Sequence, residues 1–215
     1  MNKVFQFGED VEGFNIRVLN EREIRAAAGI LFLMMLISIL TVIMKGDFTL
    51  LKYAVIIFLT DISVRVFINP KYAPTLILGR WIVRNQVPEY VGAPQKKFAW
   101  IIGFVLAITM FVLLVLVNSY SPITGLICFV CLIFLFFETS FGICLGCKFY
   151  PLFFKDKVQY CPGEVCEVKD RHEIQKTSWL HLIILMIFIA FVAVLFVFVG
   201  EFFSLKPFDL FGLEK

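Results

Sequence analysis

Long apolar runs separated by short polar segments dominate the chain. A helix that crosses the roughly 30 Å hydrocarbon core of a bilayer needs roughly 20 residues. Runs close to that length occur at residues 26–44, 49–68, 99–117, 123–145 and 180–203. The pattern therefore predicts an all-α fold, a polytopic membrane bundle of about five transmembrane helices.

Lysine and arginine residues fall unevenly on the two sides of this predicted bundle. With the N-terminus in the cytoplasm, fifteen of the 20 lie in cytoplasmic segments, four lie on the opposite side, and Arg65 lies within the second span. Cytoplasmic loops of membrane proteins carry the excess of these residues. The distribution therefore predicts a cytoplasmic N-terminus and, after five crossings, an external C-terminus.

The polar segments between the runs predict how the chain is organised. Pro74 fits the first turn of a helix, so a short interfacial helix on the inner leaflet is expected at about 74–86. A partly buried loop helix would give the same pattern. The expected parts are a cytoplasmic N-terminal arm (1–25), a membrane bundle of four spans (26–147), a cytoplasmic cysteine-containing loop (148–178), and a fifth span with a short external tail (179–215).

Composition agrees with a membrane protein and excludes several other classes. Hydrophobic residues make up 60% of the chain and charged residues 17%, with 26 Phe and a mean hydropathy of +0.88. A soluble domain has about 45–50% apolar and about 25% charged residues. Disordered chains, coiled coils and ordinary cytosolic enzymes are therefore excluded, and the lipid bilayer is the expected surrounding. The net charge of +3 is too small to support nucleic-acid binding.

Three ionisable residues lie at membrane depth, where charges are costly and usually face the bundle interior. Asp61 and Arg65 are four residues apart, so they share a helix face and can pair. Glu138 lies in the fourth span, which runs in the same direction as the second, so the three groups can meet in the inner half of the bundle. Two interpretations remain open. The residues form a structural ion-pair cluster, or Glu138 is a proton acceptor or ligand-facing carboxylate that Arg65 neutralises.

Four of the six cysteines lie close together in the sequence. Cys144 and Cys147 stand where the fourth span leaves the membrane, with Gly146 available to end the helix, and Cys161 and Cys166 follow in the loop. Thiols in the cytosol stay reduced, so lasting structural disulfides are not expected. Thiol redox chemistry or sulfur transfer, metal binding and an incidental role all remain open.

The two pairs of thiols differ in their expected surroundings. Cys161 precedes Pro162 and would lie at a helix N-terminus, where the helix dipole stabilises a thiolate. Cys144 and Cys147 are expected at a helix C-terminus, where the dipole opposes a thiolate. We therefore expect Cys161 to be the better nucleophile and the other pair to resolve the exchange or accept sulfur. As metal ligands the four would resemble a zinc ribbon, although the spacing of Cys161 and Cys166 departs from one.

The remaining candidates carry weaker signals. Cys128 and Cys131 share one face of the fourth span, where cysteine is most often a small apolar residue. His172 in the charged loop and His181 at the start of the fifth span are either ligands or solvated side chains. No phosphate-binding glycine loop, Ser-His-Asp pattern or HExxH motif occurs, so ordinary hydrolase and nucleotide-driven chemistry have no support.

Several strings resemble a known family: FLTDISVR (58–65), NPKYAP (69–74), PEYVGAP (88–94), KFAW (97–100) and ETSFGICLGCKFY (138–150). Over about residues 55–150 the chain resembles bacterial integral membrane proteins catalogued as domain of unknown function 4395. Its N-terminal arm and cysteine loop resemble a Bacteroidetes-type branch. The resemblance implies a helical, multi-pass protein of the bacterial inner membrane, and it points to rhodanese-like or thioredoxin-like partners. It implies no activity. Its motif positions are Asp61, Arg65, Glu138, Cys144 and Cys147.

These features together predict an inner-membrane thiol protein that handles sulfur transfer or thiol–disulfide exchange at the cytoplasmic face, without a cofactor. A homo-oligomer or other membrane subunits would suit so small a bundle. One alternative is a four-cysteine zinc site with a structural or sensory role, and another is a non-catalytic subunit of a larger membrane complex. The residues assigned to the thiol chemistry are the reacting pair Cys144 and Cys147, the exchange partners Cys161 and Cys166, and the proton and charge relay of Glu138, Arg65 and Asp61.

Overall fold

The computed structural model describes residues 6–153 and, separately, single positions between 179 and 198. The chain divides into two compact units, residues 1–168 and residues 169–215, and each is described by itself. In the second unit the described positions are helical. The rest of the predicted fifth span lies outside the described residues, as do Cys161, Cys166, His172 and His181.

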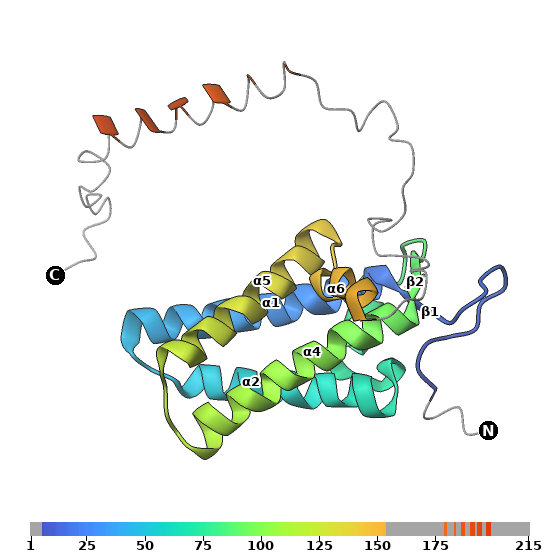
Figure 1. The fold of residues 1–215 in the computed structure, drawn as a ribbon, viewed down its shortest axis with the longest axis horizontal. Helices are drawn as coiled ribbons and strands as arrows, with labels where there is room; N and C mark the ends of the chain where they lie inside the picture. The colour runs from blue at the N-terminus through green and yellow to red at the C-terminus, as the bar shows by residue number, and fades with distance from the viewer. Residues whose placement is uncertain are drawn as a thin grey trace, which may run out of the picture. The chain divides into compact units, whose positions relative to one another are not determined.

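Four long helices form the first unit (Figure 1). Helix α1 lies against α5, and α2 lies against α4. Helices α2 and α4 each continue as a π-helical turn, Val64–Ile68 and Val112–Leu116. The four helices are α1 (Glu21–Lys45), α2 (Thr49–Ser63), α4 (Ala93–Phe111) and α5 (Pro122–Phe141).

Several short elements accompany the bundle, and β1, β2 and α6 gather at one end of it (Figure 1). The two strands pair antiparallel, with Leu19 opposite Val91. The protein is therefore mostly helical, as predicted, but the all-α expectation misses this pair, because each strand has only 3 residues. The short elements are β1 (Val18–Asn20), a 3₁₀ turn (Pro70–Tyr72), α3 (Pro74–Val83), β2 (Tyr90–Gly92) and α6 (Leu145–Phe153).

Three of the described helices are long and apolar enough to cross a membrane: α1, α4 with its extension (Ala93–Leu116), and α5. Helix α2 and its extension cover the predicted second span, but they carry Lys52, Asp61 and Arg65. The described residues thus support a membrane protein with three such helices. Five crossings and the orientation stay predictions.

The outward faces of the helices are apolar as well as the inward faces. On α1, Leu31 and Met35 are buried, whereas Leu33 and Ile37 are each more than half exposed. A surface helix of a soluble protein carries polar residues on its outer face. Apolar residues on both faces indicate that the bundle is surrounded by lipid.

Local side-chain chemistry defines the beginnings of two helices. Asn20 caps α1, because its side-chain oxygen accepts the N–H of Arg22 at 3.2 Å. Ser121 and Thr124 form a capping box at the start of α5, with Pro122 in the first turn. Helix α1 therefore begins at Glu21, inside the segment expected to form the N-terminal arm.

Helix α5 ends earlier than expected, at Phe141 rather than near residue 145. Gly142 adopts the left-handed conformation, with φ of 65°, and its N–H closes the last turn on Glu138 O. The Arg25 side chain lies over this glycine and donates from Nη2 to Thr139 O at 3.5 Å. The predicted helix end at Gly146 is wrong, because Gly146 lies inside the next helix, α6.

Helix α3 ends at Val83, close to the predicted interfacial helix of about 74–86. One of its faces packs on α1, where Gly79 lies so near that an added Cβ would come within 2.6 Å of Glu23 O. The other face exposes Ile77, Trp81 and Ile82. The helix thus combines a packed face with an exposed apolar face, which suits a location at the lipid interface.

Candidate functional site

A disulfide bond joins Cys144 and Cys147, whose Cα atoms are 5.2 Å apart. Cys144 immediately precedes α6, and its Sγ accepts the backbone N–H of Cys147 at 3.3 Å. The pair therefore lies at the N-terminus of a helix, where the dipole and the free N–H groups stabilise a thiolate. This corrects the expectation of a helix C-terminus, and it removes the reason for ranking Cys144 and Cys147 below Cys161 as nucleophiles.

Helix α6 holds the disulfide against α4. Gly146 approaches Ala99 so closely that an added Cβ would lie 2.7 Å from the Ala99 Cβ. Tyr150 adds an edge-to-face contact with Phe98, with ring centroids 5.7 Å apart. Both cysteines are consequently buried, with Cys144 7% and Cys147 1% exposed.

A cavity of about 60 Å³ lies beside the disulfide. Cys144, Glu138 and Arg65 all border it, so the structure brings together three of the predicted site residues. Cys131 also borders this cavity, whereas Cys128 borders neighbouring cavities further along α5. Both of these thiols are free and buried. The remaining wall is mainly apolar.

Arg65 and Asp61 form the ion pair that their spacing suggested. Arg65 Nε lies 2.7 Å from Asp61 Oδ2, and both side chains are almost completely buried. Thr75 completes the group, because it donates its N–H and its hydroxyl to Asp61 and accepts from Arg65 Nη2 at 2.6 Å. The guanidinium also stacks over Trp100, 5.1 Å from the ring centroid. Arg65 is thus fixed as part of the cavity wall.

Glu138 pairs with Lys96 and not, as predicted, with Arg65. Lys96 Nζ lies 2.7 Å from Glu138 Oε1 and 2.8 Å from Glu21 Oε2, and the lysine is 0% exposed. The contact with Glu21 is ionic only, since the Glu21 carboxylate has no hydrogen-bond partner within the described part of the chain. Two carboxylates around one ammonium give this cluster a net charge of −1 when all three are ionised.

Strand pairing explains why Lys96 lies beside Glu21. The Glu21 N–H donates to Glu89 O at 2.7 Å and the Ala93 N–H donates to Arg17 O at 2.9 Å, so the first turns of α1 and α4 are held together. The sequence showed Lys96 only as one of the cytoplasmic cations beside the third span. Because α4 begins at Ala93, this lysine is in fact in the first turn of a membrane helix.

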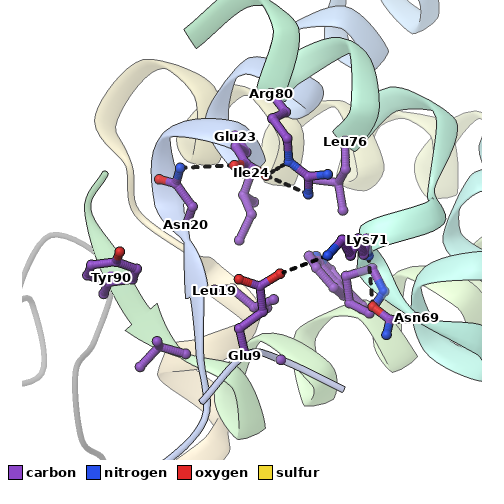
Figure 2. Close-up of a pocket in the computed structure, with 14 residues that line it drawn as sticks. Glu9, Leu19, Asn20, Glu23, Ile24, Asn69, Lys71, Leu76, Arg80 and Tyr90 are labelled. Atoms are coloured by element: carbon purple, nitrogen blue, oxygen red, sulfur yellow. Dashed lines mark hydrogen bonds and ion pairs between the residues drawn. The ribbon is translucent and has the colours of Figure 1, made fainter. Parts of the chain in front are cut away.

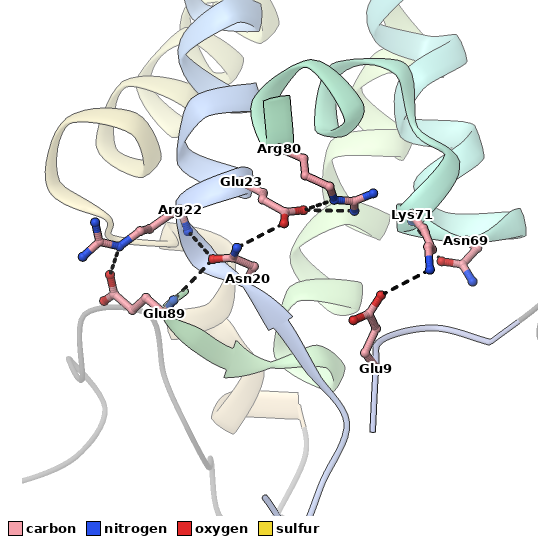
Figure 3. A network of polar contacts seen from close by, with 8 residues as sticks. All are labelled: Glu9, Asn20, Arg22, Glu23, Asn69, Lys71, Arg80 and Glu89. Carbon is pink, nitrogen blue, oxygen red and sulfur yellow. Dashed lines mark hydrogen bonds and ion pairs between the residues drawn. The ribbon is translucent and has the colours of Figure 1, made fainter. Parts of the chain in front are cut away.

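A second pocket of about 100 Å³ opens near the strands (Figure 2). It shares Trp100 with the cavity beside the disulfide. Charged pairs surround it: Arg80 Nη2 lies 3.0 Å from Glu23 Oε2, and Lys71 Nζ lies 3.9 Å from Glu9 Oε1. Figure 3 shows how Asn20 connects this group through Glu23 and through the Glu89 N–H. Pairs with exposed or half-buried partners stabilise weakly, so we assign these two pairs to fixing the short elements.

The structure describes two of the four cysteines that were proposed as zinc ligands. Cys161 and Cys166 lie outside the described residues. Within residues 6–153 no group of three or more His, Cys, Asp and Glu side chains is arranged to hold a metal ion. Cys144 and Cys147, the described half, are joined to each other by the disulfide.

Comparison with known families gives one match, to the model described as domain of unknown function (DUF4395), over residues 19–155. The chain belongs to the DUF4395 family. This confirms the resemblance seen in the sequence, and the DUF4395 match extends beyond residues 55–150 to include Leu19 and Asn20 of β1 and the whole of α1. No curated protein and no solved structure matches the chain. Its function therefore has to be argued from the site.

Proposed function

We propose that this DUF4395 protein carries out thiol–disulfide exchange or sulfur transfer through the Cys144–Cys147 pair. The observation that carries the proposal is a disulfide at a helix N-terminus, beside a cavity that Glu138 and Arg65 also border. A helix N-terminus favours the thiolate that such chemistry needs. The disulfide is then a reversible one, in agreement with the expectation that a cytosolic site holds no lasting structural disulfide.

Each step of the exchange has a group suited to it. An incoming thiolate attacks Cys144 Sγ, a mixed disulfide forms, and the electron pair of the broken bond passes to Cys147 as a thiolate. The first turn of α6 stabilises that negative charge. Glu138 takes the proton of the incoming thiol, because it borders the same cavity and belongs to the cluster with Lys96 and Glu21. In the reverse of this step the Cys147 thiolate attacks Cys144 Sγ and releases the partner thiolate. When the pair is reduced, Cys144 is the nucleophile that attacks a disulfide of the partner.

The proposal also includes the cellular location of the site and its exchange partner. We place the site on the cytoplasmic side of a bacterial inner membrane, in a chain of five crossings, and the distribution of lysine and arginine supports this orientation. There a thioredoxin-like or rhodanese-like protein is the expected exchange partner. The exposed apolar faces of the bundle are available for lipid, for a second copy of the chain, or for another membrane subunit.

Trapping the mixed disulfide tests the proposal. The variant Cys147→Ser leaves Cys144 without a resolving thiol, so it should accumulate a disulfide-linked adduct with a small thiol protein in cells. Cys144→Ser should form no such adduct, and Cys128→Ser, changed on a thiol outside the site, should behave as the wild type. Absence of any adduct with Cys147→Ser would count against the proposal. About one equivalent of bound zinc in the purified protein would favour the four-cysteine metal site instead.

A further inference from the structure

The size of the cavity beside Cys144 limits what can react there. It measures about 60 Å³, and a water molecule needs roughly 10–15 Å³ of such space. The whole glutathione molecule is far larger than this space. Because Cys144 is 7% exposed, a reactant that fits wholly within the cavity has to be about the size of a few water molecules.

One buried N–H group beside the cavity lacks a partner within the described part of the chain. Trp100 Nε1 has no hydrogen-bond partner, and Trp100 is 4% exposed. The neighbouring Arg65 guanidinium bonds through Nε to Asp61 and through Nη2 to Thr75. Both side chains border the cavity. Buried donors are normally satisfied, so the cavity favours a small molecule that accepts hydrogen bonds.

The rest of the wall favours a molecule that arrives uncharged. Leu31, Phe58 and Ile62 line it, together with other apolar residues. The two charged groups of the wall are already paired, Arg65 with Asp61 and Glu138 with Lys96. A charged reactant would lose its hydration on entry without gaining a free counter-ion. A neutral molecule that becomes a nucleophile after giving up a proton avoids this cost.

We propose that hydrogen sulfide is the small substrate of this cavity, and that the site forms a persulfide on Cys144. The inference rests on the proposed function and adds its substrate class. Hydrogen sulfide enters neutral and gives one proton to Glu138. The hydrosulfide attacks Cys144 Sγ, so a new S–S bond forms as the Cys144–Cys147 bond breaks, and the electron pair of that bond leaves on Cys147 as a thiolate. Atoms and electrons balance without a further oxidant.

The persulfide then has surroundings that suit it. Its terminal sulfur lies in the cavity, which Trp100 borders, so that Trp100 Nε1 can donate to it. The Cys147 thiolate stays in the first turn of α6. Transfer of the terminal sulfur to an acceptor thiol leaves Cys144 and Cys147 as thiols. Exchange with a disulfide of a partner protein, which leaves as two thiols, would then re-form the Cys144–Cys147 bond and return the site to its starting state. The site thus accepts sulfide in the first half of a sulfur-transfer reaction.

Opening of the disulfide by sodium sulfide tests the inference on the full chain in detergent, without oxygen. Glutathione at an equal thiolate concentration is the comparison. Sulfide should open the disulfide faster than glutathione and give a mass gain of one hydrogen sulfide, which peptide mapping after alkylation assigns to Cys144. A rate no faster than that of glutathione, or an adduct on Cys147, overturns the inference.

Two substitutions test whether the cavity is where sulfide reacts. Gly103 borders the cavity, and an added Cβ would meet only Ile62 Cδ1, at 3.9 Å. Gly103→Ala should therefore fold and narrow the cavity, slowing opening by sulfide about tenfold. Gly125→Ala, with nothing within 4 Å of the new Cβ, is the matched control and should keep the wild-type rate. Equal rates for the two alanine variants would overturn the inference.

Trp100→Phe provides an independent variant, because it keeps a ring beneath Arg65 and removes only the N–H donor. It should slow opening by sulfide and leave opening by glutathione unchanged, and an unchanged sulfide rate counts against the inference. The outcomes also separate the two proposals. If glutathione opens the disulfide and sulfide does not, the substrate is wrong and thiol exchange stands. If neither opens it and no mixed disulfide is trapped, both proposals fail.

Discussion

Lys96 is expected to contribute more to stability than any exposed lysine, because it pairs with both Glu21 and Glu138 and is completely buried. Lys96→Met removes the ammonium and leaves two carboxylates in a low-dielectric site, so the cluster charge changes from −1 to −2. Breaking a buried ion pair on one side costs about 3–5 kcal/mol. We expect a loss of that size in the free energy of unfolding.

The assay is equilibrium unfolding of the purified protein in mixed detergent micelles, followed by circular dichroism. Lys97→Met is the matched control, since Lys97 is exposed and its Nζ lies over the Phe7 ring, 5.3 Å from the centroid. Loss of this contact should cost at most about 1 kcal/mol. An equal loss for the Lys96 and Lys97 variants would refute the reasoning.

A triple variant separates charge burial from packing. Adding Glu21→Gln and Glu138→Gln to Lys96→Met removes every charge of the cluster and nearly preserves its volume. Replacing a buried ion cluster by uncharged groups of similar size is often neutral, so the triple variant should recover most of the lost free energy. If it is no more stable than Lys96→Met alone, the loss comes from packing and the electrostatic explanation is wrong.

Three further predictions concern the site and its orientation. Gly146→Ala puts a Cβ 2.7 Å from Ala99 Cβ, so it should lower the free energy of unfolding by about 1–3 kcal/mol and speed reduction of the disulfide; an unchanged reduction rate would contradict the packing of α6. Asp61→Asn leaves Arg65 buried without its carboxylate, so thermal or detergent unfolding should show a loss of about 3–5 kcal/mol, and a loss below that of an exposed pair would contradict it. A membrane-impermeant maleimide should label Cys161 only after cells are permeabilised, and labelling of intact cells would reverse the orientation.

Local sequence was sufficient for the helices and for contacts within one helix. The apolar runs correspond to α1, α2, α4 and α5, because a lipid-facing helix satisfies its backbone within its own segment. The pair of Asp61 and Arg65 follows from a spacing of four residues. The cap at Asn20 follows from its side chain. None of these features needs a contact with a distant part of the chain.

The ion-pair partner of Glu138 could not be predicted from local sequence. Lys96 is 42 residues away, and its position depends on the pairing of two three-residue strands that have no clear sequence signal. The sequence offered Arg65 because this cation was predicted at membrane depth, in a span that runs in the same direction as that of Glu138. The predicted start of the third span, at residue 99, excluded Lys96 from the bundle, whereas α4 begins six residues earlier, at Ala93.

The sequence by itself determined that this is a helical membrane protein of the DUF4395 family, and which cysteines and charged residues to consider. Tertiary structure decided what those residues do. Gly142 and Gly146 both permit a helix end, but Gly146 is needed for the close approach to Ala99, so the chain turns at Gly142. That choice moves Cys144 from the end of one helix to the beginning of another and reverses the sign of the dipole acting on it. Helix periodicity and lipid burial are local properties, whereas helix packing depends on the whole bundle.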